Sequence, residues 1–121
     1  MAVSAVLHAA GWDVFVPLFG AHSRIDLVIG RGSEILRVQC KTSRISAGAV
    51  RFRACSNTSN VPLDYVGQID AFGVYSPELD RVYLVPIDVV PSRAGCLRIE
   101  AARNGQSVGI RWASDYEVGP A

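Results

Sequence analysis

The start of the chain carries apolar side chains at helical spacing. Val3, Val6, Leu7 and Ala10 fall at i, i+3, i+4 and i+7, which places them on one face of a helix. Gly11 follows directly, and glycine often ends helices because it adopts the left-handed conformation at no steric cost. We therefore predict that a short amphipathic helix opens the chain.

After this helix the chain breaks into short, largely apolar runs separated by turn residues, as is typical of strands, and the runs at 13–17 and 50–53 also alternate apolar with polar positions. The runs cover residues 13–17, 25–29, 35–42, 50–53, 71–75, 82–85 and 97–99. A turn at 30–32 and a polar loop at 76–80 predict two antiparallel hairpins. We expect an α/β or α+β fold in which the helix precedes a mixed sheet of about four or five strands with hairpin connections. The large aromatic side chains are expected in the core: Trp12, Tyr65, Tyr75, Tyr83 and Trp112.

Length and composition limit the class of protein. The chain has 121 residues, of which 50% are apolar, and this suits one continuous core. We therefore expect one domain over residues 1–121. No stretch approaches the roughly 20 consecutive apolar residues of a membrane helix, and residues 1–10 lack the basic start of a secretory signal. We expect a cytoplasmic protein without a membrane segment.

The charged and sulfur-containing residues single out one side chain. The formal net charge is +1, so no global excess of positive charge points to nucleic acid. The three cysteines have spacings that fit no zinc site. Of the 12 basic residues, Lys41 is the one lysine. Lysine can lose its proton in a suitable environment whereas arginine stays charged, so this position is a candidate for chemistry.

Two polar side chains lie on one face of the run 35–42. Because side chains alternate across a strand, Gln39 and Lys41 point to the same side. In the preceding run, Ile25, Leu27 and Ile29 are expected to share one face and Asp26 to lie on the other. A buried carboxylate is unfavourable unless it is paired or bound to metal.

Two interpretations of these residues remain open. In the first, Asp26, Gln39 and the backbone carbonyl of Cys40 supply the hard oxygen ligands of a divalent metal that activates water on a phosphodiester. Lys41 then stabilises the charge on the phosphate or helps to deprotonate the water. In the second, Asp26 forms a structural salt bridge with Lys41, and Gln39 is a solvated residue.

Candidates for nucleic-acid contacts come after this run. Arg44, Arg51 and Arg53 could bind phosphates, and two of them share a strand face; a solvated strand face is the alternative. Asn57 and Asn60 lie in a polar stretch that could contact base edges. Turn formation is the alternative function of these asparagines.

The segments Arg24–Ile29 and Leu36–Thr42, which read RIDLVI and LRVQCKT, resemble the core motif of the PD-(D/E)XK nuclease superfamily. They are most similar to intron-encoded homing endonucleases, which resemble archaeal Holliday junction resolvases and carry glutamine where the superfamily usually has its second acid. The resemblance continues through segments near residues 11–17, 65–70, 74–77, 83–86 and 111–117. It implies a restriction-endonuclease-like core.

The resemblance also implies an activity. It identifies Asp26 and Gln39 as metal-site residues, Lys41 as the catalytic lysine and Mg²⁺ as the ion of a metal-dependent endonuclease that cuts double-stranded DNA. We expect a homo-oligomer, either a dimer or a tetramer, because one small domain can hardly act on both strands.

The chain departs from the family pattern at two places. Ile25 replaces the proline of the motif, and residues 1–12 contain no acid, although relatives usually carry a glutamate in the first helix. Three explanations are open: a longer chain, a metal held by one ligand fewer, or a fold with weakened or lost cleavage. The rival functions are accordingly a non-catalytic DNA-binding or assembly module and a Holliday junction resolvase.

Overall fold

The structure is a computed structural model that describes residues 2–19, 24–58, 61–64, 68–90, 94–100 and 110–119. For residues 55–58 and 61–64 it describes the backbone alone. No helix among the described residues is long and apolar enough to span a membrane.

The predicted opening helix is confirmed as α1 (Ala2–Ala9). Val3 and Leu7 are its buried residues, and Gly11 has a φ of 98°, the left-handed conformation expected after a helix end. The helix packs closely on the sheet at Gly73. A Cβ placed on this glycine would lie 2.8 Å from Cγ1 of Val3. A side chain at that position would push the helix away.

A five-stranded sheet forms the body of the fold, with the strand order β1-β2-β3-β8-β9. All neighbours in it are antiparallel except β3 and β8, which are parallel. The mixed sheet after an N-terminal helix confirms the predicted α+β class. The strands are β1 (Asp13–Phe15), β2 (Leu27–Arg31), β3 (Glu34–Thr42), β8 (Ala71–Ser76) and β9 (Arg81–Pro86).

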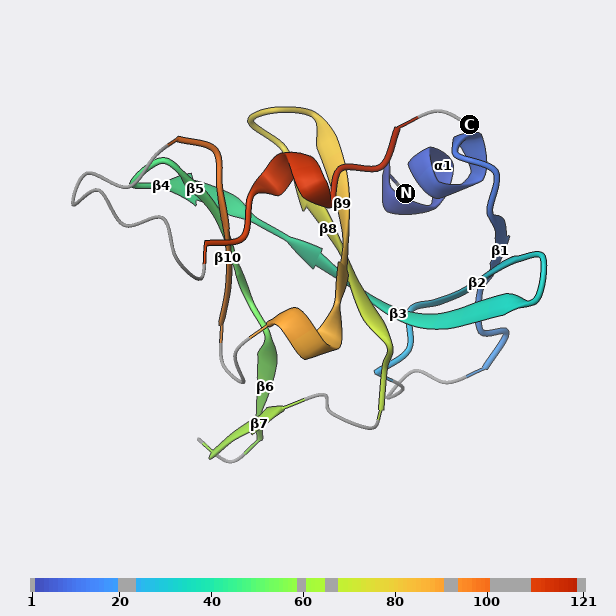
Figure 1. Cartoon of the computed structure of the whole chain (residues 1–121). Coiled ribbons are helices and arrows are strands. Elements are labelled where there is room, and N and C mark those ends of the chain that lie inside the picture. Colours follow the sequence, from blue (N-terminus) through green and yellow to red (C-terminus); the bar gives the residue numbers. More distant parts are fainter. Residues whose placement is uncertain are drawn as a thin grey trace.

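Two smaller β-structures accompany this sheet. A three-stranded sheet has the order β10-β5-β4, and β6 with β7 makes a two-stranded ribbon that projects from the rest of the molecule (Figure 1). Short 3-10 helices lie at Ile87–Val89 and Ala113–Asp115. The strands are β4 (Arg44–Ser46), β5 (Ala49–Arg53), β6 (Cys55–Thr58), β7 (Val61–Asp64) and β10 (Ala94–Arg98).

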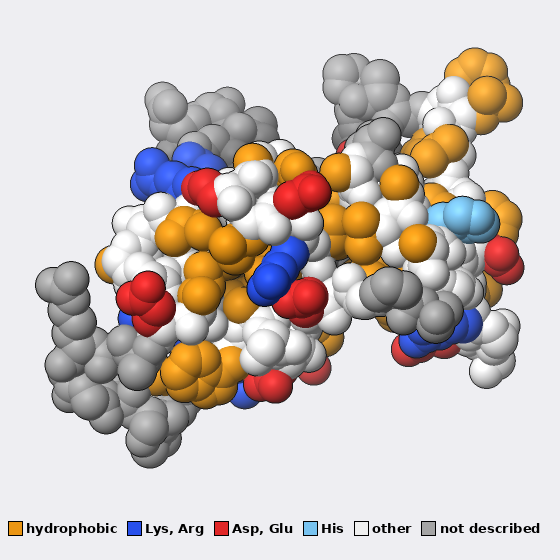
Figure 2. All heavy atoms as spheres, turned by 90° about the horizontal axis from the view of Figure 1, so that it is seen from above, with side chains coloured by type: hydrophobic (Ala, Val, Ile, Leu, Met, Phe, Trp, Pro, Cys, Tyr) orange, Lys and Arg blue, Asp and Glu red, His pale blue; other side chains and the backbone are white. Residues whose placement is uncertain are grey.

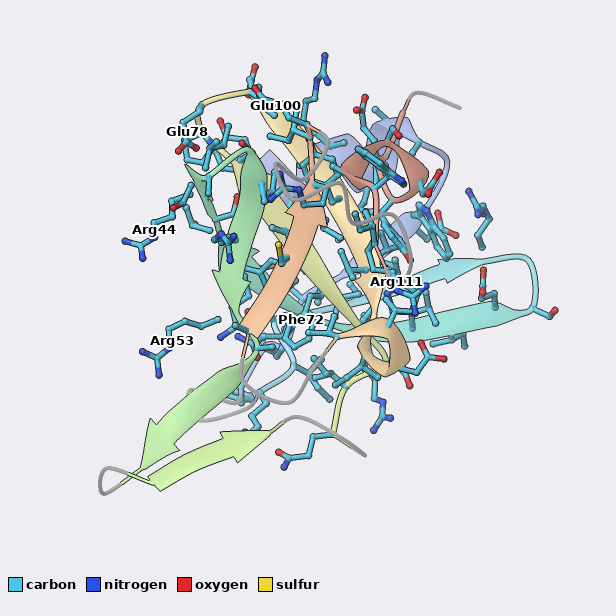
Figure 3. All side chains as sticks on the ribbon, turned by 60° about the vertical axis from the view of Figure 1, so that its left-hand side comes forward. Arg44, Arg53, Phe72, Glu78, Glu100 and Arg111 are labelled. Atoms are coloured by element: carbon cyan, nitrogen blue, oxygen red, sulfur yellow. The ribbon has the colours of Figure 1, made fainter. Side chains whose placement is uncertain are left out.

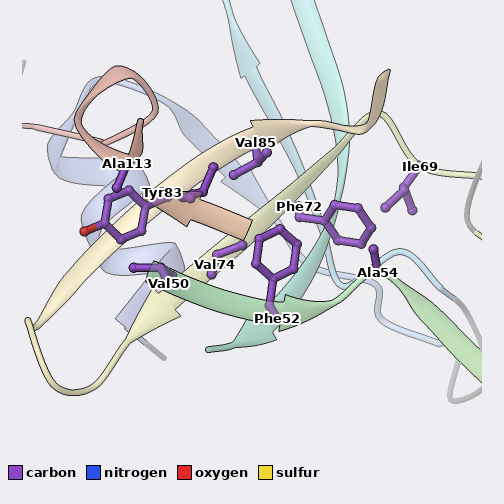
Figure 4. Close-up of a cluster of buried hydrophobic side chains, with 10 residues drawn as sticks. Val50, Phe52, Ala54, Ile69, Phe72, Val74, Tyr83, Val85 and Ala113 are labelled. Atoms are coloured by element: carbon purple, nitrogen blue, oxygen red, sulfur yellow. The ribbon is translucent and has the colours of Figure 1, made fainter. Parts of the chain in front are cut away.

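The core consists of two clusters on opposite faces of the five-stranded sheet. On one face, α1 packs against β1, β8 and β9, and its Leu7 shares a buried cluster with Leu27 of β2 and Val38 of β3. On the other face, the three-stranded sheet packs on β8 and β9, and the rings of Phe52 and Phe72 lie 5.5 Å apart between their centroids (Figure 4). The small sheet therefore covers β8 and β9, whereas the same face of β3 keeps partly exposed side chains.

Both predicted hairpins form, with different turns. β2 pairs with β3, and Arg31 faces Glu34 across a turn at residues 32–33 rather than 30–32. β8 pairs with β9 across residues 77–80, rather than the predicted 76–80, because Ser76 is still paired with Arg81. The ladder extends further into each turn than alternation alone indicated.

Other predictions about the strands need correction. Ile25 does not share a face with Leu27 and Ile29: it packs with the cluster under the small sheet, and they pack under α1. The backbone bends at Asp26, before β2 begins, so the alternation does not extend across it. Trp112 is 38% exposed and not in the core. The mixed sheet has five strands as expected, but the prediction did not include β4, β6 and β7. Trp12 and Tyr83 are buried as expected, whereas Tyr65 lies outside the described residues.

Candidate metal and catalytic site

β3 carries the candidate residues on the face that points away from the helix. Val38 belongs to the cluster under α1, so its neighbours at odd positions point to the opposite side. Gln39 and Lys41 are both partly buried there, and they pair in register with Phe72 and Val74 of β8. The predicted sharing of one face by Gln39 and Lys41 is confirmed.

Asp26 lies beside this strand, immediately before β2. Its backbone N–H donates to the carbonyl of Val38 at 2.9 Å, the same β3 residue that pairs with Leu27. Its carboxylate oxygen Oδ2 accepts hydrogen bonds from Nε2 of Gln39 at 2.9 Å and from the backbone N–H of Cys40 at 2.8 Å. The other oxygen, Oδ1, takes part in neither bond. The structure therefore joins Asp26 and Gln39 directly.

One buried atom of Gln39 finds no hydrogen-bond partner in the part of the chain that the structure describes. Its amide nitrogen is satisfied by Asp26, but its carbonyl oxygen Oε1 is buried and has no hydrogen-bond partner among the described residues. Such an atom costs on the order of 1–3 kcal/mol in a folded protein unless something binds it. The interpretation of Gln39 as a solvated residue is wrong, and the unpartnered oxygen is what a metal ligand needs.

Cys40 can contribute through its backbone and not through its sulfur. The N–H and C=O of one strand residue point to the same edge, and the N–H of Cys40 points to Asp26, so its carbonyl lies on the edge of β3 nearest to that carboxylate. Burial, with a smaller contribution from the charge of Asp26, raises the pKa of the Cys40 thiol to about 11. The thiol therefore stays protonated at neutral pH and is a poor metal ligand.

These donors fit a hard divalent cation. The described residues contain no group of three or more His, Cys, Asp and Glu side chains that could hold a metal, so a site here must draw on amide and carbonyl oxygens. Asp26, Gln39 and Cys40 provide a carboxylate, an amide oxygen and a backbone carbonyl, which are the ligand types that Mg²⁺, Ca²⁺ and Mn²⁺ prefer. The residues present fit such an ion.

A second aspartate on the other side of β3 binds an arginine. Nε and Nη2 of Arg37 donate to the two carboxylate oxygens of Asp70, both at 3.0 Å. The guanidinium holds the pKa of Asp70 below its usual range, mainly through these side-chain hydrogen bonds. Sequence reasoning gave neither residue a role, although Arg37 occupies the same strand face as Gln39 and Lys41.

The predicted DNA-binding arginines form a separate surface. Arg51 and Arg53 alternate along β5 with the buried Val50 and Phe52, so they point outward from the small sheet, and Arg44 pairs in register with Arg51. Arg44 and Arg53 project away from the core in the same general direction (Figure 3). The structure does not place these arginines on the face of β3 that carries Gln39 and Lys41.

Charge on the visible surface is mixed. Figure 2 shows basic side chains in small groups interspersed with acidic ones, in keeping with the net charge of +1. Asn57 lies on β6, where the backbone alone is described, and Asn60 lies outside the described residues. The prediction that both read bases stays a prediction.

Comparison with known proteins places the chain in a family. A solved structure described as that of a bacterial homing endonuclease, I-Ssp6803I, matches with a TM-score of 0.69 and 26% sequence identity, over 96% of this chain and 83% of that chain. No curated protein sequence matches the chain significantly. The family model for PD-(D/E)XK endonucleases, nucleases that typically use divalent metals, matches residues 1–119. The chain therefore belongs to the PD-(D/E)XK endonuclease family.

Proposed function

We propose that this protein is a Mg²⁺-dependent endonuclease that hydrolyses phosphodiester bonds of double-stranded DNA. The observation that carries the proposal is the pairing of Asp26 with Gln39, in which the buried Oε1 of Gln39 has no hydrogen-bond partner within the described part of the chain. Family membership supports the nuclease activity. The similarity to a homing endonuclease supports duplex DNA as the substrate.

Each residue of the site has a proposed part in the reaction. Asp26, Gln39 and the carbonyl of Cys40 would hold the metal ion, which would supply Lewis-acid polarisation of the phosphate and activation of water. The hydrogen bonds to Asp26 from Gln39 and Cys40 keep the carboxylate oriented before the metal arrives. Lys41, on the same strand face as Gln39, stabilises the negative charge that develops on the phosphate or accepts a proton from the water.

DNA binding requires surfaces beyond the metal site. The β6–β7 ribbon projects from the body of the fold (Figure 1), and a two-stranded ribbon is narrow enough to enter the major groove of DNA. Arg44, Arg51 and Arg53 lie exposed on the strands that lead to this ribbon, so we assign them to phosphates that flank the cleaved one. Neutral replacements of all three arginines should lower DNA affinity and flatten its dependence on salt.

A homo-oligomer of single-domain subunits in the cytoplasm completes the proposal. Five large apolar side chains are exposed near β1 and the β2–β3 hairpin, which exceeds the scattered exposure usual for a monomer. Sedimentation of the wild type and of Leu18→Ser measures whether this surface holds subunits together. The five are Phe15, Val16, Leu18, Phe19 and Ile35.

Replacing Lys41 tests the catalytic mechanism. Lys41→Met keeps the length and apolar stem of the side chain but removes the ammonium, so cleavage should fall on the order of a hundredfold or more while DNA affinity changes far less. Lys41→Arg keeps the charge but offers no accessible neutral form, so it should also impair cleavage. Mg²⁺-dependent cleavage, thermal stability and DNA affinity are to be measured for both variants.

The same measurements separate the rival functions. Near-normal cleavage by Lys41→Met would end the proposed mechanism, and lost stability with unchanged specific activity would restore the salt-bridge interpretation. A wild type that binds duplex DNA without cutting it in Mg²⁺ would be the non-catalytic module. Cleavage of four-way junctions in preference to linear duplex would identify a resolvase.

A further inference from the structure

Arg37 and Asp70 are joined by both backbone and side-chain hydrogen bonds. The backbone N–H of Asp70 donates to the carbonyl of Arg37 at 2.8 Å, and the backbone N–H of Arg37 donates to Oδ2 of Asp70 at 2.8 Å. The guanidinium adds its two bonds of 3.0 Å to the same carboxylate. Asp70 thus binds both the main chain and the side chain of one β3 residue.

This pair lies at the start of the parallel β3–β8 ladder. The register begins at Val38 and Ala71, the residues that follow Arg37 and Asp70 directly. Between the two strands the chain passes through a long crossover, from residue 43 to residue 70, so no tight turn sets their register as it does in a hairpin. A shift by one residue would move Gln39 away from its place beside Phe72.

Stability alone does not account for such a pair. The side chains of Arg37 and Asp70 remain 40% and 36% exposed, and exposed ion pairs contribute little to folding. Arg37 lies two residues before Gln39 and four before Lys41, on their face of β3. The carbonyl of Asp70 also accepts the backbone N–H of Ile87 at 3.0 Å, so Asp70 connects β3 to the segment after β9.

We propose that Asp70, acting through Arg37, is a positioning residue that holds β3 in the register and place at which Gln39 and Lys41 can act. The inference rests on the proposed nuclease function, since it assigns Asp70 a part in the same site. Asp70 itself does not touch the substrate or the metal. Its contribution is to the geometry of β3, and a displacement of about 1 Å in an active site can cost a hundredfold in rate.

Two substitutions of Asp70 test this proposal in the full chain. Asp70→Asn places an amide N–H group against the guanidinium, and Asp70→Glu keeps the charge but displaces the carboxylate by one methylene. Both should lower kcat about tenfold or more at saturating Mg²⁺, with a change in KM for DNA of less than about threefold. The matched control is Glu117→Gln, which removes a different ion pair, Arg81 with Glu117 at 3.4 Å, and should leave kcat unchanged.

A spectroscopic measurement keeps this test independent of activity. In ¹⁵N-labelled protein, the side-chain amide of Gln39 and the backbone amide of Cys40 should shift in Asp70→Asn and Asp70→Glu and remain in place in Glu117→Gln. Titration with Mg²⁺ should move the Gln39 amide in the wild type and require higher Mg²⁺ in the Asp70 variants.

The outcomes distinguish the two proposals. If Asp70→Glu folds with unchanged kcat and unmoved Gln39 and Cys40 signals, the positioning assignment is overturned. If the wild type neither cuts DNA nor responds to Mg²⁺, the nuclease proposal fails, and the variants' amide shifts still show whether Asp70 positions β3.

Discussion

Two aspartates flank β3 in nearly equivalent positions, and they differ in what binds their carboxylates. Asp26 precedes β2 and Asp70 precedes β8. Each donates its backbone N–H to a carbonyl of β3, and each accepts a backbone N–H of β3 through Oδ2. The second donor is the neutral amide of Gln39 for Asp26, but the charged guanidinium of Arg37 for Asp70.

This difference shows that one local arrangement of an aspartate beside a strand can suit either strand pairing or cation binding. Asp70 is bound by a guanidinium through both oxygens, the bidentate geometry that makes arginine–carboxylate pairs specific. Asp26 accepts both of its bonds on Oδ2 from uncharged donors, next to the unpartnered Oε1 of Gln39. Asp70 is therefore suited to hold strands together, and Asp26 is suited to bind a cation.

The largest expected effect comes from Asp26→Asn. An asparagine oxygen in the place of Oδ2 can keep the hydrogen bonds from Gln39 and Cys40, so the melting temperature should change by no more than about 2 °C. The variant loses the charge and the second oxygen that a divalent metal requires. Cleavage should fall on the order of a thousandfold, as expected when metal catalysis is removed. Comparable cleavage rates for variant and wild type in Mg²⁺ would exclude Asp26 as a ligand.

The same substitution at Asp70 should lower thermal stability more, and cleavage less, than Asp26→Asn does. An asparagine there cannot accept from Arg37 on both sides, so Asp70→Asn should lower the melting temperature by about 3 °C, a modest loss because the pair is partly exposed, while retaining measurable cleavage. Calorimetry and a cleavage assay on the two asparagine variants compare them directly. Equal losses of stability at both sites would show that the two carboxylates are not functionally distinct.

Local sequence patterns predict much of this comparison, but not the part that depends on distant strands. The helical periodicity of α1 and the shared strand face of Gln39 and Lys41 each depend on a single local segment, and both predictions are confirmed. The bend at Asp26 placed Ile25 in the other cluster, which alternation could not anticipate. Strands as short as β4 and β6 carry too few residues for a period. The Arg37–Asp70 pair joins residues 33 positions apart, and no local pattern indicates that contact.

The smallest expected effect is the loss of the stability that Asp70 contributes when the pH falls. Arg37 lowers the pKa of Asp70 in the folded protein, so the stability that this carboxylate contributes is fully present above its unfolded pKa of about 3.9. The contribution is lost as the pH falls through the lower, folded pKa. The gap in unfolding free energy between the wild type and Asp70→Asn should therefore stay constant from pH 7 to about pH 5 and narrow below about pH 4.

Glu78→Gln is the matched comparison, because the pKa of Glu78 is lowered chiefly by the backbone N–H of Ile45 rather than by an arginine. Added salt should therefore weaken the Asp70 contribution more than that of Glu78. Urea titrations at several pH values and two salt concentrations measure both gaps. An Asp70 gap that widens in acid would contradict the assigned pairing with Arg37.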